Sequence, residues 1–392
     1  MIPKYRLLFL SLLAVSCSPG PGAVPPYDAD RSRTVVIPVE LHDGPLRFDS
    51  LVRSHTFTPL ETHEGCMVGA VDRLFRRDSS VWLLDRRMSK ALYVFGADGR
   101  FCRMIGRQGR GPGEYVEPTD FALTASGATV LDMFGRRLLH YAPDGTWRGS
   151  SPLNCILYEI AADPAGAGFY AVGGDNRRCD SLRGYEILGL DSVGGVRFRC
   201  CADDFTMNFS NGCELQTFGG GMVYRKTLRP EVCSLHGRRV ETRYRFDIAS
   251  SPLPDDCERL CRGDFGRFIE RYRDDHTWFN GRFWETDRYV GAGFTSRRTD
   301  YLLIYDKQTG RTVSGWAGIT YGLRGEDTDG YLTAVLSGPV DVTGSRITGL
   351  IDAHRLARRP SSSSSSGASD EPLGANPVLV TVELRPADLS GK

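Results

Sequence analysis

Residues 81–85 (Val-Trp-Leu-Leu-Asp), 91–95 (Ala-Leu-Tyr-Val-Phe) and 101–105 (Phe-Cys-Arg-Met-Ile) decide the fold of this chain. Each run is short and rich in aliphatic and aromatic side chains, which favours a β-strand. The pair Asp98-Gly99 lies between the second and third runs and supplies the positive φ that a tight hairpin turn needs. This stretch therefore predicts strand, strand, tight turn and strand.

The same order returns along the chain with a period in the forties. Asp85 and Asp132 are 47 residues apart, and the turn residues Gly99 and Gly145 are 46 apart. Weaker copies turn at Gly194-Gly195 and His236-Gly237, and a clear late copy turns at Thr309-Gly310. Several short strands per repeat of this length are typical of a β-propeller, in which each small twisted sheet buries its faces against its neighbours around a ring. We therefore predict an all-β propeller.

One segment has helical rather than strand periodicity. Its apolar positions follow steps of three and four, as on one face of a helix: Cys257, Cys261, Phe265, Phe268, Ile269 and Tyr272. Pro254-Asp255-Asp256 before them suits a helix start. We predict a short helical insertion at about 252–275, between two blades.

The N-terminus has the layout of a secretory signal. Lys4 and Arg6 precede an apolar run at 7–15, which is too short to span a bilayer as a helix. Cys17 follows small residues and resembles the cysteine of a bacterial lipobox. That resemblance implies a signal peptide at 1–16, acylation of Cys17 and a membrane anchor. The proline- and glycine-rich residues 17–33 then predict a flexible tether.

The glycine run at 105–115 (Ile-Gly-Arg-Gln-Gly-Arg-Gly-Pro-Gly-Glu-Tyr) follows a unit that carries Phe-Gly-Ala-Asp-Gly at 95–99. It resembles the six-bladed β-propeller lipoproteins related to NHL repeats, a largely uncharacterised family common in gut anaerobes with two membranes. The closing segment at 376–380 (Asn-Pro-Val-Leu-Val) is similar to that family's last strand. The resemblance implies one six-bladed propeller over residues 34–392 and a place in the cell envelope, at the outer membrane, on either face.

Two features depart from that family. A serine-rich, low-complexity loop is predicted at about 360–376. Ten cysteines besides Cys17 are many for a reducing compartment, and we expect roughly one to three disulfides among them.

Charge and motifs limit the possible chemistry. A formal net charge of +1 gives no overall field that would attract nucleic acid. The glycine run lacks the Gly-Lys-Ser/Thr ending and following helix of a phosphate loop, which favours a tight crossover between blades. Cys257, Cys261 and His276 do not complete a set of four zinc ligands. The sequence contains no convincing catalytic triad, so we assign no catalytic residue, metal or cofactor.

The best ligand-binding candidates are Trp278, Phe279, Trp284 and Arg282, because exposed aromatic faces can stack on sugars or peptide side chains. Packing of these rings onto a blade is the favoured alternative. We predict a monomeric, non-catalytic binding or scaffold module for an envelope protein or a glycan or peptide ligand. The alternative is a secreted glycan- or peptide-acting enzyme with its site in the central channel, which two or more channel carboxylates or histidines would favour.

Overall fold

The computed structural model describes residues 34–386 except 167, 175, 177–178, 180, 203–212, 262–263, 318–327 and 354–374. The predicted signal peptide (1–16), Cys17, the tether (17–33) and most of the serine-rich loop lie outside the described residues. No helix within the described ranges is long and apolar enough to cross a bilayer.

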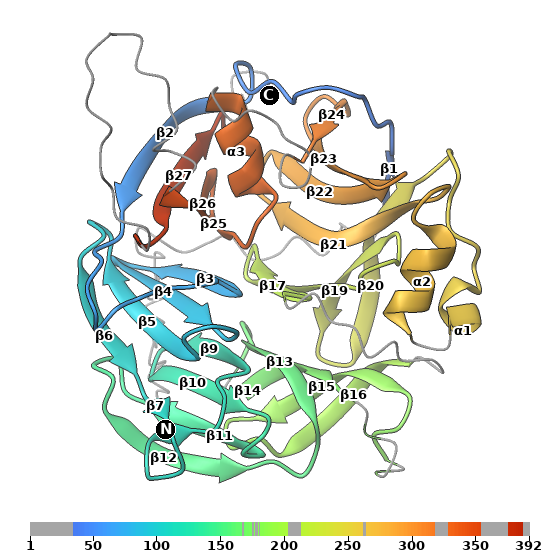
Figure 1. Cartoon of the computed structure of the whole chain (residues 1–392). Coiled ribbons are helices and arrows are strands. Elements are labelled where there is room, and N and C mark those ends of the chain that lie inside the picture. The colour runs from blue at the N-terminus through green and yellow to red at the C-terminus, as the bar shows by residue number, and fades with distance from the viewer. Residues whose placement is uncertain are drawn as a thin grey trace, which may run out of the picture.

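Six small antiparallel sheets stand around a central channel, as Figure 1 shows. Blade 1 contains β3 (Arg73–Arg77), β4 (Ser80–Asp85), β5 (Ala91–Gly96) and β6 (Phe101–Ile105), and blade 2 contains β9 (Asp120–Thr124), β10 (Gly127–Asp132), β11 (Arg137–Tyr141) and β12 (Trp147–Pro152). Blade 3 contains β13 (Leu157–Ala162), β14 (Gly168–Gly173), β15 (Tyr185–Asp191) and β16 (Val196–Ala202). The first strand of each blade faces the channel.

The second half of the ring follows the same plan with two additions. Blade 4 contains β17 (Leu215–Phe218), β18 (Gly221–Arg225), β19 (Glu231–His236) and β20 (Arg239–Asp247), and β1 (Val35–Pro38) adds a parallel strand to its edge. Blade 5 contains β21 (Thr277–Glu285), β22 (Tyr289–Ser296), β23 (Thr299–Asp306) and β24 (Thr312–Trp316). Blade 6 contains β25 (Asp341–Thr343), β26 (Arg346–Ile351), β27 (Val378–Leu384) and β2 (Val52–Pro59). The predicted all-β, six-bladed propeller is confirmed.

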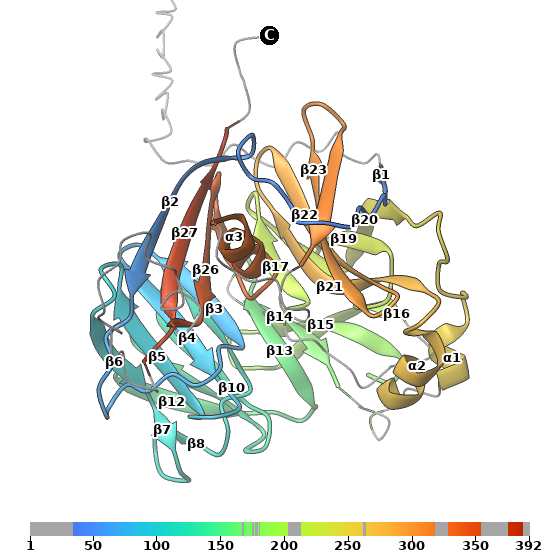
Figure 2. The same ribbon diagram turned by 45° about the horizontal axis from the view of Figure 1, so that its top comes forward.

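The ring closes because the two ends of the chain share blade 6. Strand β2, from the N-terminal part, pairs antiparallel with β27, so that Val52 lies opposite Leu384 (Figure 2). Asn376 fastens this joint: its side chain accepts a hydrogen bond from Val68 N at 2.8 Å and donates one to Glu61 O at 2.7 Å. The serine-rich loop predicted to extend to 376 therefore ends earlier, since Asn376 is buried in the core.

Buried aspartates explain the period read from the sequence. The Asp85 carboxylate, at the end of β4, accepts hydrogen bonds from the backbone N–H groups of Gly69, Ala70 and Met88. Asp132, at the end of β10, accepts from Val116 and Gly135 in the same way. Each aspartate ties the segment that enters its blade to the turn after the second strand, which explains why blades 1 and 2 carry it at the same place.

The glycine run forms the predicted tight crossover, from blade 1 to blade 2. The short strands β7 (Arg107–Gln108) and β8 (Glu114–Tyr115) pair in parallel within it. The Glu114 carboxylate accepts hydrogen bonds from Gly111 N at 2.8 Å and from Arg107 Nε at 2.7 Å. An acidic side chain of the run itself thus occupies the amide cradle, and this lowers the pKa of Glu114 through the Gly111 and Arg107 donors.

The helical insertion between blades 4 and 5 is confirmed, but as two short helices, α1 (Cys257–Cys261) and α2 (Phe265–Tyr272). Asp264 caps α2 by accepting a hydrogen bond from Arg267 N. A third helix, α3 (Thr328–Leu336), is not predicted by the sequence. Most of its residues are buried against blade 6, so it lacks the polar face by which helices are recognised.

The prediction of one to three disulfides is wrong for this structure. All ten cysteines among the described residues are free thiols. Several take apolar positions in separate hydrophobic clusters, such as Cys66, Cys155 and Cys261. Buried cysteine packs as a small apolar side chain, which accounts for its use in the blades without pairing.

Candidate functional site in the central channel

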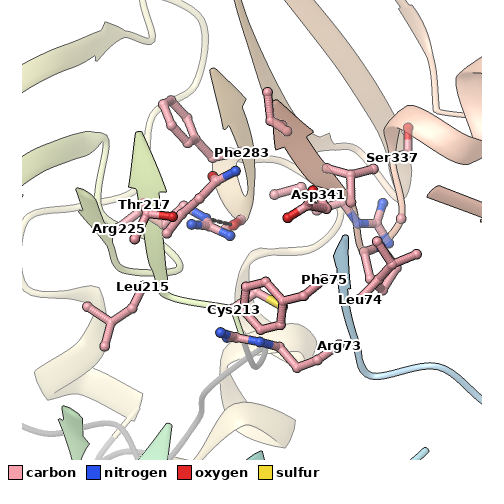
Figure 3. Close-up of a pocket in the computed structure, with 17 residues that line it drawn as sticks. Arg73, Leu74, Phe75, Cys213, Leu215, Thr217, Arg225, Phe283, Ser337 and Asp341 are labelled. Atoms are coloured by element: carbon pink, nitrogen blue, oxygen red, sulfur yellow. Dashed lines mark hydrogen bonds between the residues drawn. The ribbon is translucent and has the colours of Figure 1, made fainter. Parts of the chain in front are cut away.

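A cavity of about 230 Å³ occupies the channel between blades 1, 4, 5 and 6. Four inner strands contribute to its wall, together with β18 and the segment that leads into β25 (Figure 3). The lining residues are Arg73–Phe75, Cys213, Leu215–Thr217, Arg225, Gly281–Phe283 and Ser337–Val342. Side chains from distant parts of the sequence therefore meet at one point on the ring axis.

Much of the cavity wall is apolar. Phe75, Leu215, Phe283 and Val342 all line it. Leu215 and Phe283 are almost fully buried, and Phe75 packs edge-on against Phe121 of blade 2 with ring centroids 5.2 Å apart. Phe283 and Leu215 belong to hydrophobic clusters of the blades and Phe75 packs against another, so this apolar wall is continuous with the blade cores.

A buried ion cluster around Arg73 closes the side of the cavity toward blades 2 and 3. The Arg73 guanidinium bonds to the Glu159 carboxylate, and its Nε lies 3.4 Å from Asp120 Oδ1. Asp120 also accepts a hydrogen bond from Ile160 N at 2.8 Å. The cluster links the inner strands of three blades across the channel and holds two carboxyl groups for one guanidinium.

Glu159 extends this cluster to blade 4. Its carboxylate accepts backbone N–H groups from Cys213 at 3.0 Å, Glu214 at 2.6 Å and Leu215 at 2.8 Å. Burial alone would raise the pKa of Glu159, but Arg73 and these donors bring it below its ordinary value. Burial has the opposite net effect on Asp120 and raises its pKa, with Glu159 adding to the increase.

Arg225 is the cation of the cavity that lacks an anionic partner among the described residues. Its Nε donates to Gly281 O at 2.8 Å, and its guanidinium lies over the Phe283 ring, 5.8 Å from the centroid. Only 5% of the residue is exposed, and its Nη1 is buried without a hydrogen-bond partner in the described part of the chain. Buried polar atoms of this kind are rare in native proteins and call for an explanation.

Two carboxyl groups near Arg225 have raised pKa values. Burial, aided by the nearby Glu159 and Glu186 carboxylates, raises the pKa of Glu214 to about 8. Burial also raises the pKa of Asp341 to about 6, against the opposing effect of Arg76. At neutral pH Glu214 is therefore mostly protonated and does not balance the charge of Arg225.

Replacing Glu214 with Gln is expected to stabilise the protein at pH 8 and to have little effect at pH 5. The folded pKa of about 8 exceeds the ordinary value of 4.5, so folding disfavours the charged form. The stability contributed by Glu214 is thus present below pH 4.5 and is lost as the pH rises toward 8. We expect a gain of about 2 kcal/mol at pH 8, after discounting the full shift for relaxation of the buried site.

Thermal unfolding at both pH values measures this difference, and Glu241→Gln on the outer strand β20 controls for loss of a surface carboxylate. An equal change in stability at pH 5 and pH 8 would contradict the raised pKa of Glu214.

The structure separates the ligand-binding residues predicted from sequence. Trp278, Phe279 and Trp284 are at most 4% exposed. Trp278 packs edge-on against Phe268 of α2, and Trp284 Nε1 donates to Leu336 O at the end of α3 at 3.0 Å. The exposed aromatic patch is therefore corrected to core packing, because each ring fills the space between blade 5 and a neighbouring element.

Arg282 is the predicted residue that the structure does bring to the cavity. It lines the wall, and its Nη1 lies 3.4 Å from Asp300 Oδ2. Arg73, Arg225 and Asp341 lie in the same wall and were missed by the sequence analysis. The available signal was the charged start of two inner strands, Arg73 and Asp120, one repeat apart and ahead of strands already recognised.

Within the described ranges, no group of three or more histidine, cysteine, aspartate or glutamate side chains is placed to hold a metal ion. The Cys257 and Cys261 thiols belong instead to the hydrophobic cluster that joins α1 and α2 to Trp278.

Solved structures with the same architecture confirm the fold. A Bacteroides fragilis protein predicted to be exported (BF0058) superimposes with a TM-score of 0.73 at 16% identity, covering 90% of this chain and 100% of that one. A member of the DUF4221 family from Bacteroides vulgatus superimposes with a TM-score of 0.50 at 9% identity, covering 88% and 99%. At these identities the likeness concerns the fold alone.

A search of curated proteins gives no significant match. The sequence profile of one family, described as a domain of unknown function (DUF4934), matches residues 34–382, which is nearly the whole described propeller. The chain therefore belongs to the DUF4934 family of six-bladed β-propellers.

Proposed function

We propose that this chain is an extracytoplasmic binding module, tethered to a membrane by a lipid on Cys17, whose ligand occupies the channel cavity. The observation that carries the proposal is the cavity itself, with the unpartnered Nη1 of Arg225 in its wall. A preformed concave site with apolar walls and a few polar groups is the usual form of a small-molecule site.

The location part of the proposal rests on two supports. The lipobox-like Cys17 follows a signal-like segment, and the Bacteroides fragilis protein of similar fold is predicted to be exported. We extend this to anchoring in the outer membrane, as the resemblance to propeller lipoproteins related to NHL repeats implies. The tether at 17–33 would leave the ring free to turn toward a ligand source on either face of the membrane.

The binding part rests on the energetics of the channel. A buried donor without an acceptor costs about 1–3 kcal/mol relative to a satisfied one. Ser337 Oγ, like Arg225 Nη1, is buried in the cavity wall without a hydrogen-bond partner in the described part of the chain. A ligand that accepts a hydrogen bond from either group would recover part of this free energy, which gives the cavity a preference for ligands with polar acceptors.

The alternative function, a channel-based hydrolase, has one observation in its favour. Asp341 lines the cavity with a pKa raised by burial to about 6, which suits a general acid. It is the one carboxylate among the lining residues, and these include no histidine. Asp120 and Glu159, which lie behind the wall, are engaged by Arg73. The binding module therefore remains the favoured proposal.

A bulky side chain at Thr217 tests the channel site. Thr217 is exposed at the inner strand β17 and lines the cavity, so Thr217→Trp should fill its opening without disturbing the core. Protein purified from its native membranes should retain a small molecule in native mass spectrometry, and the variant should lose it.

Thr343→Trp is the matched control, since Thr343 is an exposed threonine at the end of the inner strand β25 that is not part of the cavity wall. Retention of the same bound mass by Thr217→Trp would place the ligand elsewhere and overturn the channel site.

A further inference from the structure

We propose that the channel cavity binds a small carboxylate with an apolar body, held by Arg225 through its carboxylate and by Phe75, Leu215 and Phe283 through its apolar part. This inference rests on the proposed function and adds the chemical class of the ligand.

The position of Arg225 indicates an anionic partner. Gly281 O fixes its Nε, so the guanidinium cannot swing out to solvent without breaking that bond. Figure 3 shows Arg225 reaching into the cavity from the β18 side, with Asp341 on the opposite side. Arg225 therefore lines the cavity with a guanidinium whose buried Nη1 has no hydrogen-bond partner in the described part of the chain. A guanidinium presents parallel N–H groups that match the two oxygens of a carboxylate.

The charges around the cavity favour a monoanion. Arg73 is already paired with two carboxylates, those of Asp120 and Glu159, and Arg282 faces Asp300. Glu186 is bonded to Lys226 and to Tyr224 Oη. Glu214 is mostly neutral at pH 7 because its pKa is raised to about 8. Arg225 is the cavity cation left without an ion pair among the described residues, while Asp341 across the cavity would repel a second negative charge on the ligand.

The volume and walls of the cavity set the size of the apolar part. A dry cavity of about 150 Å³ in another protein holds benzene, and this one measures about 230 Å³. A body of roughly six to eight carbons together with the carboxylate therefore fits the whole cavity. Phe75, Leu215 and Phe283 would cover it from separate blades.

The test compares acids with matched neutral and cationic probes by titration calorimetry at pH 7 on the full propeller. The probes are hexanoate and phenylacetate, the alcohols 1-hexanol and 2-phenylethanol, and hexylamine. We expect the acids to bind at least about tenfold more tightly than the alcohols, which corresponds to about 1.4 kcal/mol, and hexylamine not to bind.

The variant Arg225→Gln should weaken binding of both acids at least about tenfold and leave the alcohols unchanged, because it removes the charge and keeps a shorter polar side chain. Arg100→Gln, at an exposed surface arginine, is the matched control and should bind the acids like the wild type. Since the comparison of acid with alcohol uses the wild type alone, it decides the question even where Arg225→Gln fails to fold.

The outcomes separate the two proposals. Equal affinity for acids and alcohols, or unchanged acid binding by Arg225→Gln, would overturn the carboxylate inference and leave the channel site standing. Absence of binding of any probe, together with an unchanged bound mass in Thr217→Trp, would overturn the channel site as well.

Discussion

Glu159→Ala is expected to destabilise the propeller by about 3–5 kcal/mol, the usual cost of removing one partner of a buried ion pair. The substitution leaves the buried Arg73 guanidinium without this counter-charge. It also removes the acceptor of three backbone N–H groups at the start of blade 4, those of Cys213, Glu214 and Leu215. Because this one carboxylate joins blades 1, 3 and 4 across the channel, we expect the loss to appear as a lower free energy of unfolding of the whole ring.

Denaturant unfolding monitored by tryptophan fluorescence measures this effect. Glu159→Gln keeps an acceptor oxygen and the shape of the side chain but loses the charge, so it should cost less than Glu159→Ala. Glu241→Ala is the surface control: its partner Arg239 has a side chain that is 74% exposed, and such pairs contribute at most about 1 kcal/mol. Equal losses for Glu159→Ala and Glu241→Ala would show that the Arg73 cluster does not hold the blades together.

Cys17→Ser is expected to move the protein from the membrane fraction to the soluble fraction. Serine cannot form the thioether to the lipid, and the apolar run at 7–15 is too short to anchor the chain as a spanning helix. A lipid anchor accounts for membrane attachment only if this one sulfur is needed, so the effect should be nearly complete.

Cell fractionation followed by immunoblotting, with labelling by a fatty-acid analogue, gives the readout. Cys102→Ser is the matched control, because Cys102 is an exposed free cysteine of the propeller itself. It should remain in the membrane fraction and carry the label. A Cys17→Ser protein that still sediments with membranes would refute the lipid anchor.

The outer parts of the blades could be predicted from sequence because their physical constraints recur. Apolar runs such as Val81–Asp85 pack between neighbouring blades, the turns at Gly99 and Gly145 have positive φ, and a buried aspartate ends the second strand of blades 1 and 2. Each of these constraints selects the same type of residue at a regular interval along the sequence. The period of 46–47 residues is therefore sufficient to predict a ring of blades from the sequence.

The inner strands and the cavity could not be predicted in the same way. Channel-facing positions need not be apolar. The inner strand Arg73–Arg77 accordingly contains three arginines and lacks the alternation of apolar and polar residues by which a strand is recognised. The partners of Arg73 come from two other blades, Asp120 and Glu159, and only the closed ring brings them together. The spacing of residues along the sequence therefore cannot predict a site whose side chains come from several blades around the ring axis.

The aromatic residues of blade 5 illustrate the opposite error. Trp278 and Trp284 stand among charged residues in the sequence, which suggests a surface. Some charged neighbours lie in the turns around β21 and Arg282 faces the channel cavity, whereas the tryptophan rings meet α2 and α3, two helices that pack outside the regular blades. Nothing in the repeat pattern indicates that these helices cover them.

A crystal structure of the propeller soaked with phenylacetate tests the central claim most directly. The account predicts the carboxylate within hydrogen-bonding distance of the Arg225 guanidinium and the ring against Phe283, inside the cavity of about 230 Å³. An empty cavity, in a crystal of protein that binds phenylacetate in solution, would contradict it.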